Sequence, residues 1–366
     1  YQPYIYTSND KGKTWKSITS NLPDRTLTWR IVQDHVEKNL FFAATEYGIY
    51  FSVNSGKSWS KLNGGVPTIS FRDLAIHKRE NDLVGASFGR GFYVFDDISV
   101  FRELSNSQMN NKATLFSVRK AWWYIARPFL GFNDPWNGLK GSQGDSYFVA
   151  PNPPFGAVFT YHLSESLVSK KDMRTEKEKS SIKKGKAVGF PGWKIVESER
   201  REREPQVIIE VKDKNGDVVR RLEGPISKGF HRVAWDLRYP SPNSILEGAA
   251  SVNVSGFLAP PGEYTVTLYT KVDGKLEKLS DSKDFDVVPL RDGALPTQSH
   301  DKIADFWRQY EKTAKRGSAI QFKVAEILKK VDRMYQAIGQ STGLVGDLDK
   351  RLSSVRNSIL EMDEAL

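Results

Sequence analysis

Residues 8–15 read Ser-Asn-Asp-Lys-Gly-Lys-Thr-Trp, and residues 52–59 read Ser-Val-Asn-Ser-Gly-Lys-Ser-Trp. An Ile-Tyr pair stands shortly before each copy, and residues 39–45 correspond to residues 81–87 farther along the chain. A repeat of roughly 40–50 residues made of short strands is typical of a β-propeller with one blade per repeat. The octapeptide therefore indicates blades of such a propeller.

The octapeptide itself predicts a tight hairpin turn. Its third residue, Asp or Asn, can accept hydrogen bonds from nearby backbone N–H groups, and its Gly can adopt positive φ. Its two hydroxyl residues can tie the turn together, and its Trp can pack beneath it as an apolar plug. The structural residues predicted in this way are Ser8, Asp10, Gly12, Thr14 and Trp15, followed by Ser52, Asn54, Gly56, Ser58 and Trp59.

The pattern resembles the Asp-box, or BNR, repeat of sialidases, sortilin-type receptors and related propellers. The resemblance implies fold rather than activity, because in those proteins the box lies at the blade periphery, away from the central axis. Asn54 keeps the turn chemistry but carries no charge, which argues against a metal there. Two blades and a third strand start at residues 91–95 cannot close a ring, which needs at least about four blades. We therefore expect residues 1–100 to be terminal blades, with the rest of the propeller upstream in a longer chain.

The composition is typical of a folded globular protein, with 39% hydrophobic residues and 27% charged residues in a chain of 366. A length of this size predicts two or three domains. The net charge is +10, from 54 Lys+Arg and 44 Asp+Glu. No stretch approaches the roughly 20 apolar residues that span a bilayer. The absence of Cys excludes disulfides, thiolate zinc sites and cysteine nucleophiles.

Residues 101–154 are aromatic and rich in turn-forming residues, which predicts a crossing segment packed over the propeller and the next domain. An alternative is that Trp122, Trp123 and Trp136 form a platform on which carbohydrate rings stack.

Residues 155–290 predict a β-sandwich. Asn215 and Gly216 give a two-residue hairpin turn between apolar strands, and several further short strands follow, with Trp235 as a core residue. The order of these motifs resembles the Ig-like domain of flagellar hook-capping proteins and of many secreted bacterial proteins.

Residues 164–204 interrupt the sandwich with a Lys/Glu-rich insertion, which predicts a solvated helix or a flexible segment. A nucleic-acid site would need basic residues free of interleaved Glu and accompanied by exposed aromatic residues. Only Phe190 and Trp193 lie near, so we expect no nucleic-acid partner.

Residues 291–366 have helical periodicity and predict three helices, centred near residues 303–310, 320–338 and 345–362. The last two have an apolar seam at heptad spacing, with a break near Gly339. This pattern predicts a helical hairpin or bundle, packed on itself or on the sandwich. The alternative is a docking seam for a partner helix or a second copy of the chain.

The sequence contains no recognisable catalytic constellation. The five His residues do not pair at metal-ligand spacing, and nucleophile, phosphate-loop and dinucleotide motifs are absent. Asp96 and Asp97 are adjacent on a strand and point to opposite faces, so they cannot act as a pair. Arg72 and Arg90 are candidates to line a propeller mouth and bind an anion. We predict no catalytic residue, metal or cofactor in this chain.

Taken as a whole, the chain resembles the C-terminal part of large bacterial proteins with sortilin-like VPS10/BNR-repeat propellers. Residues 88–98 resemble the last-blade signature of that family, and residues 229–240 resemble its Ig-like signature. The resemblance implies export to the periplasm, the outer membrane or the medium. It predicts a non-catalytic module that binds protein or glycan partners at the cell envelope. The alternative is the C-terminal part of a glycan-active hydrolase, similar to sialidases or xyloglucanases, whose catalytic residues lie in upstream blades.

Overall fold

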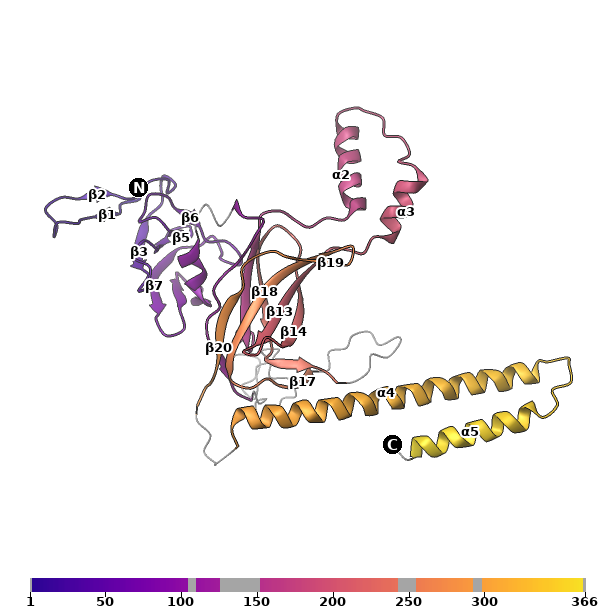
Figure 1. The fold of residues 1–366 in the computed structure, drawn as a ribbon. Coiled ribbons are helices and arrows are strands. Elements are labelled where there is room, and N and C mark those ends of the chain that lie inside the picture. The colour runs from indigo at the N-terminus through magenta and orange to yellow at the C-terminus, as the bar shows by residue number, and fades with distance from the viewer. Residues whose placement is uncertain (1, 105–109, 126–151, 243–254, 292–297, 365–366) are drawn as a thin grey trace.

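The computed structural model describes residues 2–104, 110–125, 152–242, 255–291 and 298–364. These residues form a mainly β protein with two helical parts (Figure 1). One lies in the middle of the chain and the other at its C-terminal end. Within the described residues, no helix combines the length and the apolar character needed to cross a membrane.

The N-terminal part consists of antiparallel meander sheets. Their strands are β1 (Tyr6–Thr7) and β2 (Lys16–Ser17), then β3 (Thr28–Gln33), β4 (Phe41–Thr45), β5 (Gly48–Ser52) and β6 (Ser60–Lys61), then β7 (Phe71–His77), β8 (Asp82–Ser87) and β9 (Phe92–Phe95). These strands form a hairpin, a four-stranded sheet and a three-stranded sheet. The hairpin points away from the two sheets, and in the described residues the sheets do not close into a ring (Figure 1).

Strand β4 is almost continuously apolar because both of its faces are covered. Phe42 and Ala44 pack into the core between the two sheets, with Phe71 and Leu83 from the three-stranded sheet. Ala43 points to the opposite face, where it joins a smaller cluster with Trp59 and with Ile5 from the hairpin segment. Alternating side chains of one strand therefore hold two layers together.

The short helix η1 (Ile98–Glu103) follows β9, and we call the sheets of β1–β9 together with η1 the blade-like part. Arg102 of η1 donates to both carboxylate oxygens of Asp34, at 2.9 and 3.0 Å, and to the side-chain oxygen of Asn81 at 2.7 Å. The segment that leaves the sheets is thus tied back onto both of them.

Two sheets that share one core follow, and we call this pair of sheets the sandwich without assigning it an Ig topology. The first contains β10 (Ala113–Leu115), β12 (Ala157–Leu163) and β15 (Gly229–Trp235). The second contains β11 (Ala121–Trp123), β13 (Gln206–Asp213), β14 (Val218–Gly224), β18 (Gly262–Val272), β19 (Lys275–Lys278) and β20 (Lys283–Pro289). A small ribbon of β16 (Arg238–Pro240) and β17 (Ser255–Leu258) lies beside them. Strands β10 and β11, from the segment predicted to cross between domains, therefore pair with strands of this unit.

The shared core has the residues that the alternating strand pattern predicts. Trp235 is fully buried, as expected, and its ring contacts the rings of Tyr264 and Phe285 at centroid distances of 5.3 and 6.3 Å. Gly216 has a φ of 85° in the turn between β13 and β14, but Asn215 does not have a positive φ, and residues 214–217 separate the two strands. The Asn-Gly pair thus lies in a hairpin turn as predicted, but the turn is longer than the two-residue type.

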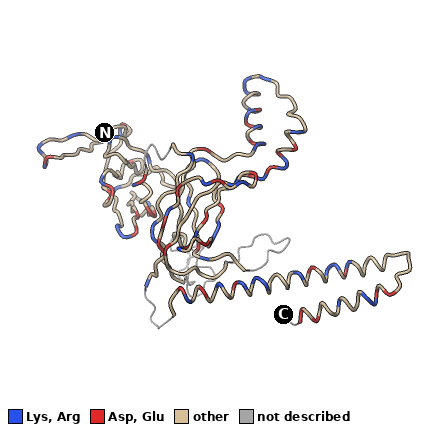
Figure 2. The backbone as a smooth tube through the Cα atoms, in the orientation of Figure 1, with Lys and Arg blue, Asp and Glu red and all other residues tan. Residues whose placement is uncertain are grey.

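The charged insertion forms a helical hairpin of α2 (Lys170–Lys183) and α3 (Trp193–Arg201), neither of which has a buried residue. It projects from the sandwich, and charges of both signs are spread along its base (Figures 1 and 2). Arg174 joins the helices through Glu199, and both of its hydrogen bonds to that carboxylate are shorter than 3 Å.

The C-terminal part contains two helices, α4 (His300–Gly339) and α5 (Leu348–Glu364). The predicted separation of the first two helices is wrong, because they form a single 40-residue helix. Gly317 stands inside it, and one Gly costs a helix only about 1 kcal/mol relative to Ala. The predicted break near Gly339 is confirmed, and α5 packs against the distal half of α4 through Val324, Val331 and Ile359.

Candidate functional site

The first octapeptide, which we call the first Asp-box for its resemblance to that motif, forms the turn between β1 and β2. Asp10 accepts hydrogen bonds from the backbone N–H of Thr14 at 2.8 Å and from its hydroxyl at 2.6 Å. Ser8 donates to the same carboxylate at 2.8 Å and accepts from the N–H of Gly12 at 2.7 Å. These hydrogen bonds from Thr14 and Ser8 lower the pKa of Asp10 to about 2. The carboxylate is therefore committed to its own turn.

The second Asp-box, between β5 and β6, has the same hydrogen bonds without the charge. Asn54 accepts from the N–H of Ser58 at 2.9 Å and donates its amide to the Ser58 hydroxyl at 2.8 Å. Ser52 donates to Asn54 and accepts from the N–H of Gly56, in both cases at 2.9 Å. An amide can thus replace the carboxylate in this turn.

The two Trp residues of the boxes differ in burial. Trp59 is 3% exposed, and its indole N–H donates to the carbonyl of Ile18 at 2.8 Å. A Cβ placed on Gly56 would lie 2.8 Å from the Cβ of Ile18, so the second box packs closely against the preceding hairpin. Trp15 is 64% exposed, and its indole N–H donates to the carbonyl of Gly12 within its own turn. Its expected position as a plug is therefore not what the structure has.

A surface of aromatic and charged side chains lies where β3 and β7 begin and where the β4–β5 and β8–β9 turns lie. We call it the Arg72 surface, and its residues are Trp29, Glu46, Tyr47, Arg72, Phe88, Arg90 and Phe92. The strand register brings these positions to one end of both sheets, because Thr28 pairs with Thr45 and Phe71 pairs with Ser87.

Arg72 lies against two aromatic rings at this surface. Its guanidinium carbon is 3.7 Å from the ring centroid of Trp29 and 4.9 Å from that of Phe88. Among the described residues, no carboxylate forms an ion pair with Arg72, whereas Arg30 on the neighbouring strand pairs with Asp73 at 3.3 Å. A guanidinium that stacks on rings still presents its N–H edge, which matches a carboxylate or phosphate.

The rings beside Arg72 are held by the backbone and by one acidic residue. Trp29 donates its indole N–H to Glu46 at 3.0 Å, and Ser70 donates to the same carboxylate oxygen at 3.2 Å. The backbone N–H of Phe88 donates to the carbonyl of Ser70 at 2.8 Å, while the Phe88 side chain is 69% exposed. The surface is thus preorganised and open to solvent.

Arg90, the second predicted anion-binding residue, is exposed at the tip of the β8–β9 turn. Gly89 and Gly91 flank it with φ values of 78° and 73°, which only Gly adopts readily. The structure therefore places Arg72 and Arg90 at the same end of the three-stranded sheet, with Phe88 two residues before Arg90.

The predicted tryptophan platform is divided. The indole N–H of Trp123 donates to the carbonyl of Ala259 at 2.9 Å, and its ring contacts His300 at the start of α4. Trp122 contacts the blade-like part through Glu80 at 3.4 Å, with Lys120 over its ring. Trp123 thus connects β11 to the start of α4, and Trp122 connects β11 to the N-terminal sheets. Trp136 lies outside the described residues.

The adjacent carboxylates that the sequence singled out have separate structural environments. Asp97 caps η1 by accepting from the backbone N–H and the hydroxyl of Ser99. Burial raises the pKa of Asp96, and the nearby carboxylate of Asp82 raises it further. The described residues contain no group of three or more His, Asp or Glu side chains that could hold a metal ion.

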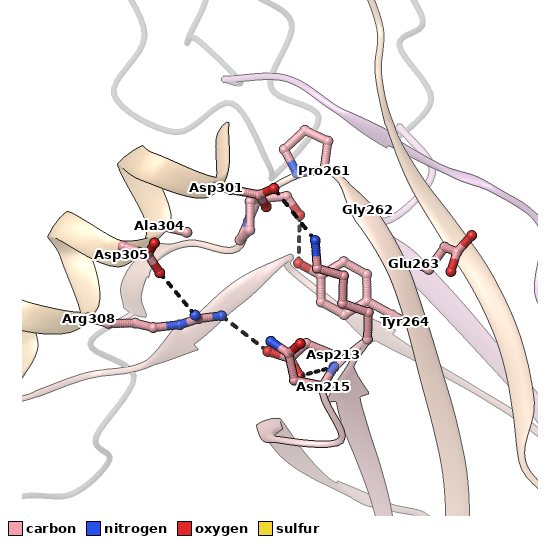
Figure 3. Close-up of a pocket in the computed structure, with 12 residues that line it drawn as sticks. Asp213, Asn215, Pro261, Gly262, Glu263, Tyr264, Asp301, Ala304, Asp305 and Arg308 are labelled. Atoms are coloured by element: carbon pink, nitrogen blue, oxygen red, sulfur yellow. Dashed lines mark hydrogen bonds and ion pairs between the residues drawn. The ribbon is translucent and has the colours of Figure 1, made fainter. Parts of the chain in front are cut away.

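A cavity lies between the sandwich and the first turns of α4 (Figure 3). Arg308 donates to Asp213 at 3.1 Å and to Asp305 at 3.3 Å, and Lys214 pairs with Asp301 at 3.5 Å. The Tyr264 hydroxyl donates to the carbonyl of Pro260. Because these charges pair with one another across the cavity, it serves as the joint that fixes α4 to the sandwich.

Three aromatic residues of the Arg72 surface, Trp29, Phe88 and Phe92, were not predicted from the sequence. The repeat that aligns residues 39–45 with residues 81–87 also aligns Arg30 with Arg72, and Trp29 directly precedes Arg30. Nothing local indicates that Trp29 contacts Arg72. The sequence does place these bulky aromatic residues at strand starts and in turns, where a core position is not expected, and this is a weak indication of a surface role.

No family model and no curated protein matches the chain. Solved structures that match include two of the extracellular domain of BT4673 from B. thetaiotaomicron, described once as a one-component and once as a hybrid two-component system. The first is 13% identical, with a TM-score of 0.20, over 77% of this chain and 28% of that one. The second is 12% identical, with a TM-score of 0.22, over 79% and 29%. The chain thus spans less than a third of either structure, and TM-scores this low establish no common fold.

Proposed function

We propose that the chain is a non-catalytic binding module of an exported bacterial protein, and that the Arg72 surface is where it contacts a protein or glycan ligand. The observation that carries this proposal is the placement of Arg72 between the rings of Trp29 and Phe88. The rings offer flat apolar area and the guanidinium offers charge, so the ligand is expected to present a carboxylate beside a sugar ring or an apolar group.

The order of the strands supports a place in a propeller. A four-stranded meander followed by a second meander is the order that consecutive blades have. The bond from Trp59 to Ile18 joins the second Asp-box to the preceding hairpin, as neighbouring blades would be joined. The resemblance to sortilin-like VPS10/BNR proteins adds the expectation of export and of a location at the cell envelope.

The outer face of the three-stranded sheet supports an upstream propeller portion as partner. Ala75, Val84 and Val94 lie in register across β7, β8 and β9, and Ala86 pairs with Phe92 in the next row. Phe92 and Val94 are exposed, although residues paired directly across strands share one face. The row of Ala75, Val84 and Val94 matches the face that one blade packs against the next, so we propose that another blade of the parent protein covers this row, with Phe92 at its border with the Arg72 surface.

Calorimetric titration of the full chain tests the proposed ligand site. The probes are a uronate-containing oligosaccharide, its neutral counterpart and a poly-glutamate peptide, which separate glycan from protein ligands. A hydrogen bond to a charged group contributes about 1.5–3 kcal/mol, so Arg72→Ala should weaken binding of the carboxylate probe roughly 10–100-fold. Arg356→Ala, at an exposed position on α5, is the matched control. Equal affinity of Arg72→Ala and the parent chain would refute the site.

The alternative function, a glycan-active hydrolase with its carboxylates in upstream blades, calls for a separate measurement. The full-length parent protein is incubated with a panel of polysaccharides, and released reducing ends are measured. Turnover that is abolished by substituting one carboxylate near the propeller axis would reject the binding proposal. Binding without turnover would support it.

A further inference from the structure

The outer end of the α2–α3 hairpin is chemically unlike its base. We call residues 179–196 the hairpin tip. They comprise the last turn of α2, the connecting loop and the first turn of α3. A 14-residue helix such as α2 is about 21 Å long, so the tip lies well away from the sandwich. Figure 1 shows the hairpin as a projection that contacts the sandwich only at its base.

Large apolar side chains are exposed at the tip. Phe190 is 64% exposed and Trp193 is 78% exposed, and their rings contact each other edge-on at 5.1 Å. The other exposed apolar residues of the tip are Ile182, Val188 and Ile195. Scattered single apolar residues on a surface are ordinary, but a group on one projection marks an interaction site.

The charge of the tip has a single sign. It contains the lysines Lys179, Lys183, Lys184, Lys186 and Lys194, and no Asp or Glu. Among the described residues, none of these lysines takes part in an ion pair, whereas at the base Arg174 pairs with Glu199 and Lys170 pairs with Asp273. Figure 2 shows Lys and Arg positions, which share one colour, at the outer end of the hairpin. The tip therefore carries five positive charges, none of which forms an ion pair within the described chain.

We infer that the hairpin tip attaches the protein peripherally to an anionic lipid surface. The apolar side chains would enter the boundary between headgroups and acyl chains, where Trp and Phe are favoured. The lysines would lie beside the acidic headgroups, and their flexible stems allow the ammonium groups to stay in the polar layer. This contact is separate from the Arg72 surface, and neither depends on the other.

The combination of residues favours lipid over nucleic acid or an acidic protein. A nucleic acid would use aromatic stacking and lysine charge, but it offers nothing to Ile182, Val188 and Ile195. Neither helix of the hairpin has a buried residue, so its aliphatic side chains are open to a partner that needs no fixed shape. An anionic membrane offers acidic headgroups to the lysines and a fluid apolar layer to the exposed aromatic and aliphatic side chains of the tip.

Sedimentation of the full chain with vesicles tests the inference. Vesicles of phosphatidylcholine alone are compared with vesicles that also contain phosphatidylglycerol. The chain should pellet with the anionic vesicles only, and added salt should weaken that binding. Each lysine near an anionic membrane contributes about fivefold in affinity, so Lys183→Gln, Lys184→Gln and Lys186→Gln together should reduce partitioning on the order of 100-fold. Phe190→Ser with Trp193→Ser should also reduce it at least about tenfold.

The β1–β2 hairpin supplies the matched control. Lys11, Lys13 and Lys16 surround Trp15, which is also exposed, but the aliphatic companions are absent there. Changing these three lysines to Gln should leave partitioning within about twofold of the parent chain. All substituted side chains are solvent-exposed, and circular dichroism verifies that each variant is folded. The inference is overturned if the chain ignores anionic vesicles, if the two sets of lysine variants behave alike, or if the tip residues are needed only for binding RNA or a poly-glutamate peptide.

Discussion

The guanidinium of Arg102 and the carboxylate of Asp34, 68 residues apart, form a two-pronged ion pair with N–O distances of 2.9 and 3.0 Å. Asp34 follows β3 and also accepts from the backbone N–H groups of Val36 and Glu37. The Asp34 side chain has no exposed area. The Asp34 carboxylate therefore fixes the turn after β3 in the four-stranded sheet and also η1, which follows the three-stranded sheet.

Arg102→Leu should destabilise the blade-like part strongly, because it leaves the buried Asp34 carboxylate without its cation. Removing one partner of a buried pair costs about 3–5 kcal/mol in free energy of unfolding. Urea unfolding followed by Trp fluorescence measures the loss. Arg30→Leu is the control, since its pair with Asp73 is exposed and should contribute at most about 1 kcal/mol. Similar losses for both variants would contradict this account.

The same pair predicts a direction of pH dependence. Burial raises the pKa of Asp34, but hydrogen bonds from Arg102, Glu37 and Val36 outweigh it and bring the pKa below the ordinary 3.8. A carboxyl whose pKa is lower in the folded state stabilises the fold above its unfolded pKa. The contribution of Asp34 should thus be complete above about pH 4 and be lost in more acidic solution. Arg102→Leu should flatten this part of the pH profile of unfolding.

The two Asp-boxes predict a local difference in acid sensitivity. Hydrogen bonds hold the pKa of Asp10 at about 2, against an ordinary value of 3.8, whereas Asn54 does not titrate. The N–H of Thr14 should therefore lose its protection from hydrogen exchange as the pH falls from 3.8 toward about 2. The N–H of Ser58, bonded to Asn54, should keep its protection factor over that range. Asn54→Asp should transfer the acid sensitivity to Ser58, and its failure to do so would refute the explanation.

The burial of the two box tryptophans predicts unequal effects of substitution. Trp59→Ala removes a buried indole and its hydrogen bond to Ile18, which should cost about 3–5 kcal/mol in free energy of unfolding. Trp15→Ala removes an exposed ring and should change the stability of the same chain by no more than about 0.5 kcal/mol. Thermal unfolding of both variants provides the comparison. A large loss for Trp15→Ala would show that its ring is covered in solution.

The Asp-box turns could be predicted from sequence because the hydrogen bonds that shape them, among the Ser, Asp or Asn, Gly and Thr or Ser positions, join residues at most four apart. The longer-range bond from Trp59 to Ile18 could not be read from that spacing. A turn at Gly216 could be predicted from similarly local contacts, although its length could not. The burial of Trp235 follows from strand alternation. The Arg72 surface could not be predicted in full. The sequence indicates Arg72 as a candidate anion-binding residue. Its contact with Trp29 and Phe88 arises only when β3 and β7 lie side by side, and no spacing in the sequence encodes that approach.

The helices illustrate the other limit of local reasoning. Apolar periodicity located the positions in α4 and α5 that pack on each other, such as Val331 and Ile359. It could not decide whether the helix continued through Gly317, because the cost of one Gly is smaller than the gain from extending a helix already anchored at both ends. The anchors are tertiary: Arg308 holds the first turns to Asp213, and α5 covers the distal half.

Asp96 predicts a pH dependence opposite to that of Asp34. Burial and the neighbouring Asp82 raise the pKa of Asp96 above the ordinary 3.8, although Arg232 and Arg119 partly offset the effect. A carboxyl whose pKa is higher in the folded state favours folding when protonated, so its ionisation costs stability as the pH rises through the folded pKa. Asp96→Asn removes that charge and should raise the unfolding midpoint at pH 7 while leaving it nearly unchanged at pH 3. Asp73→Asn, at an exposed carboxylate, is the control, and equal midpoints for Asp96→Asn and the parent chain at pH 7 would show that the ionised form of Asp96 is compensated by the two arginines.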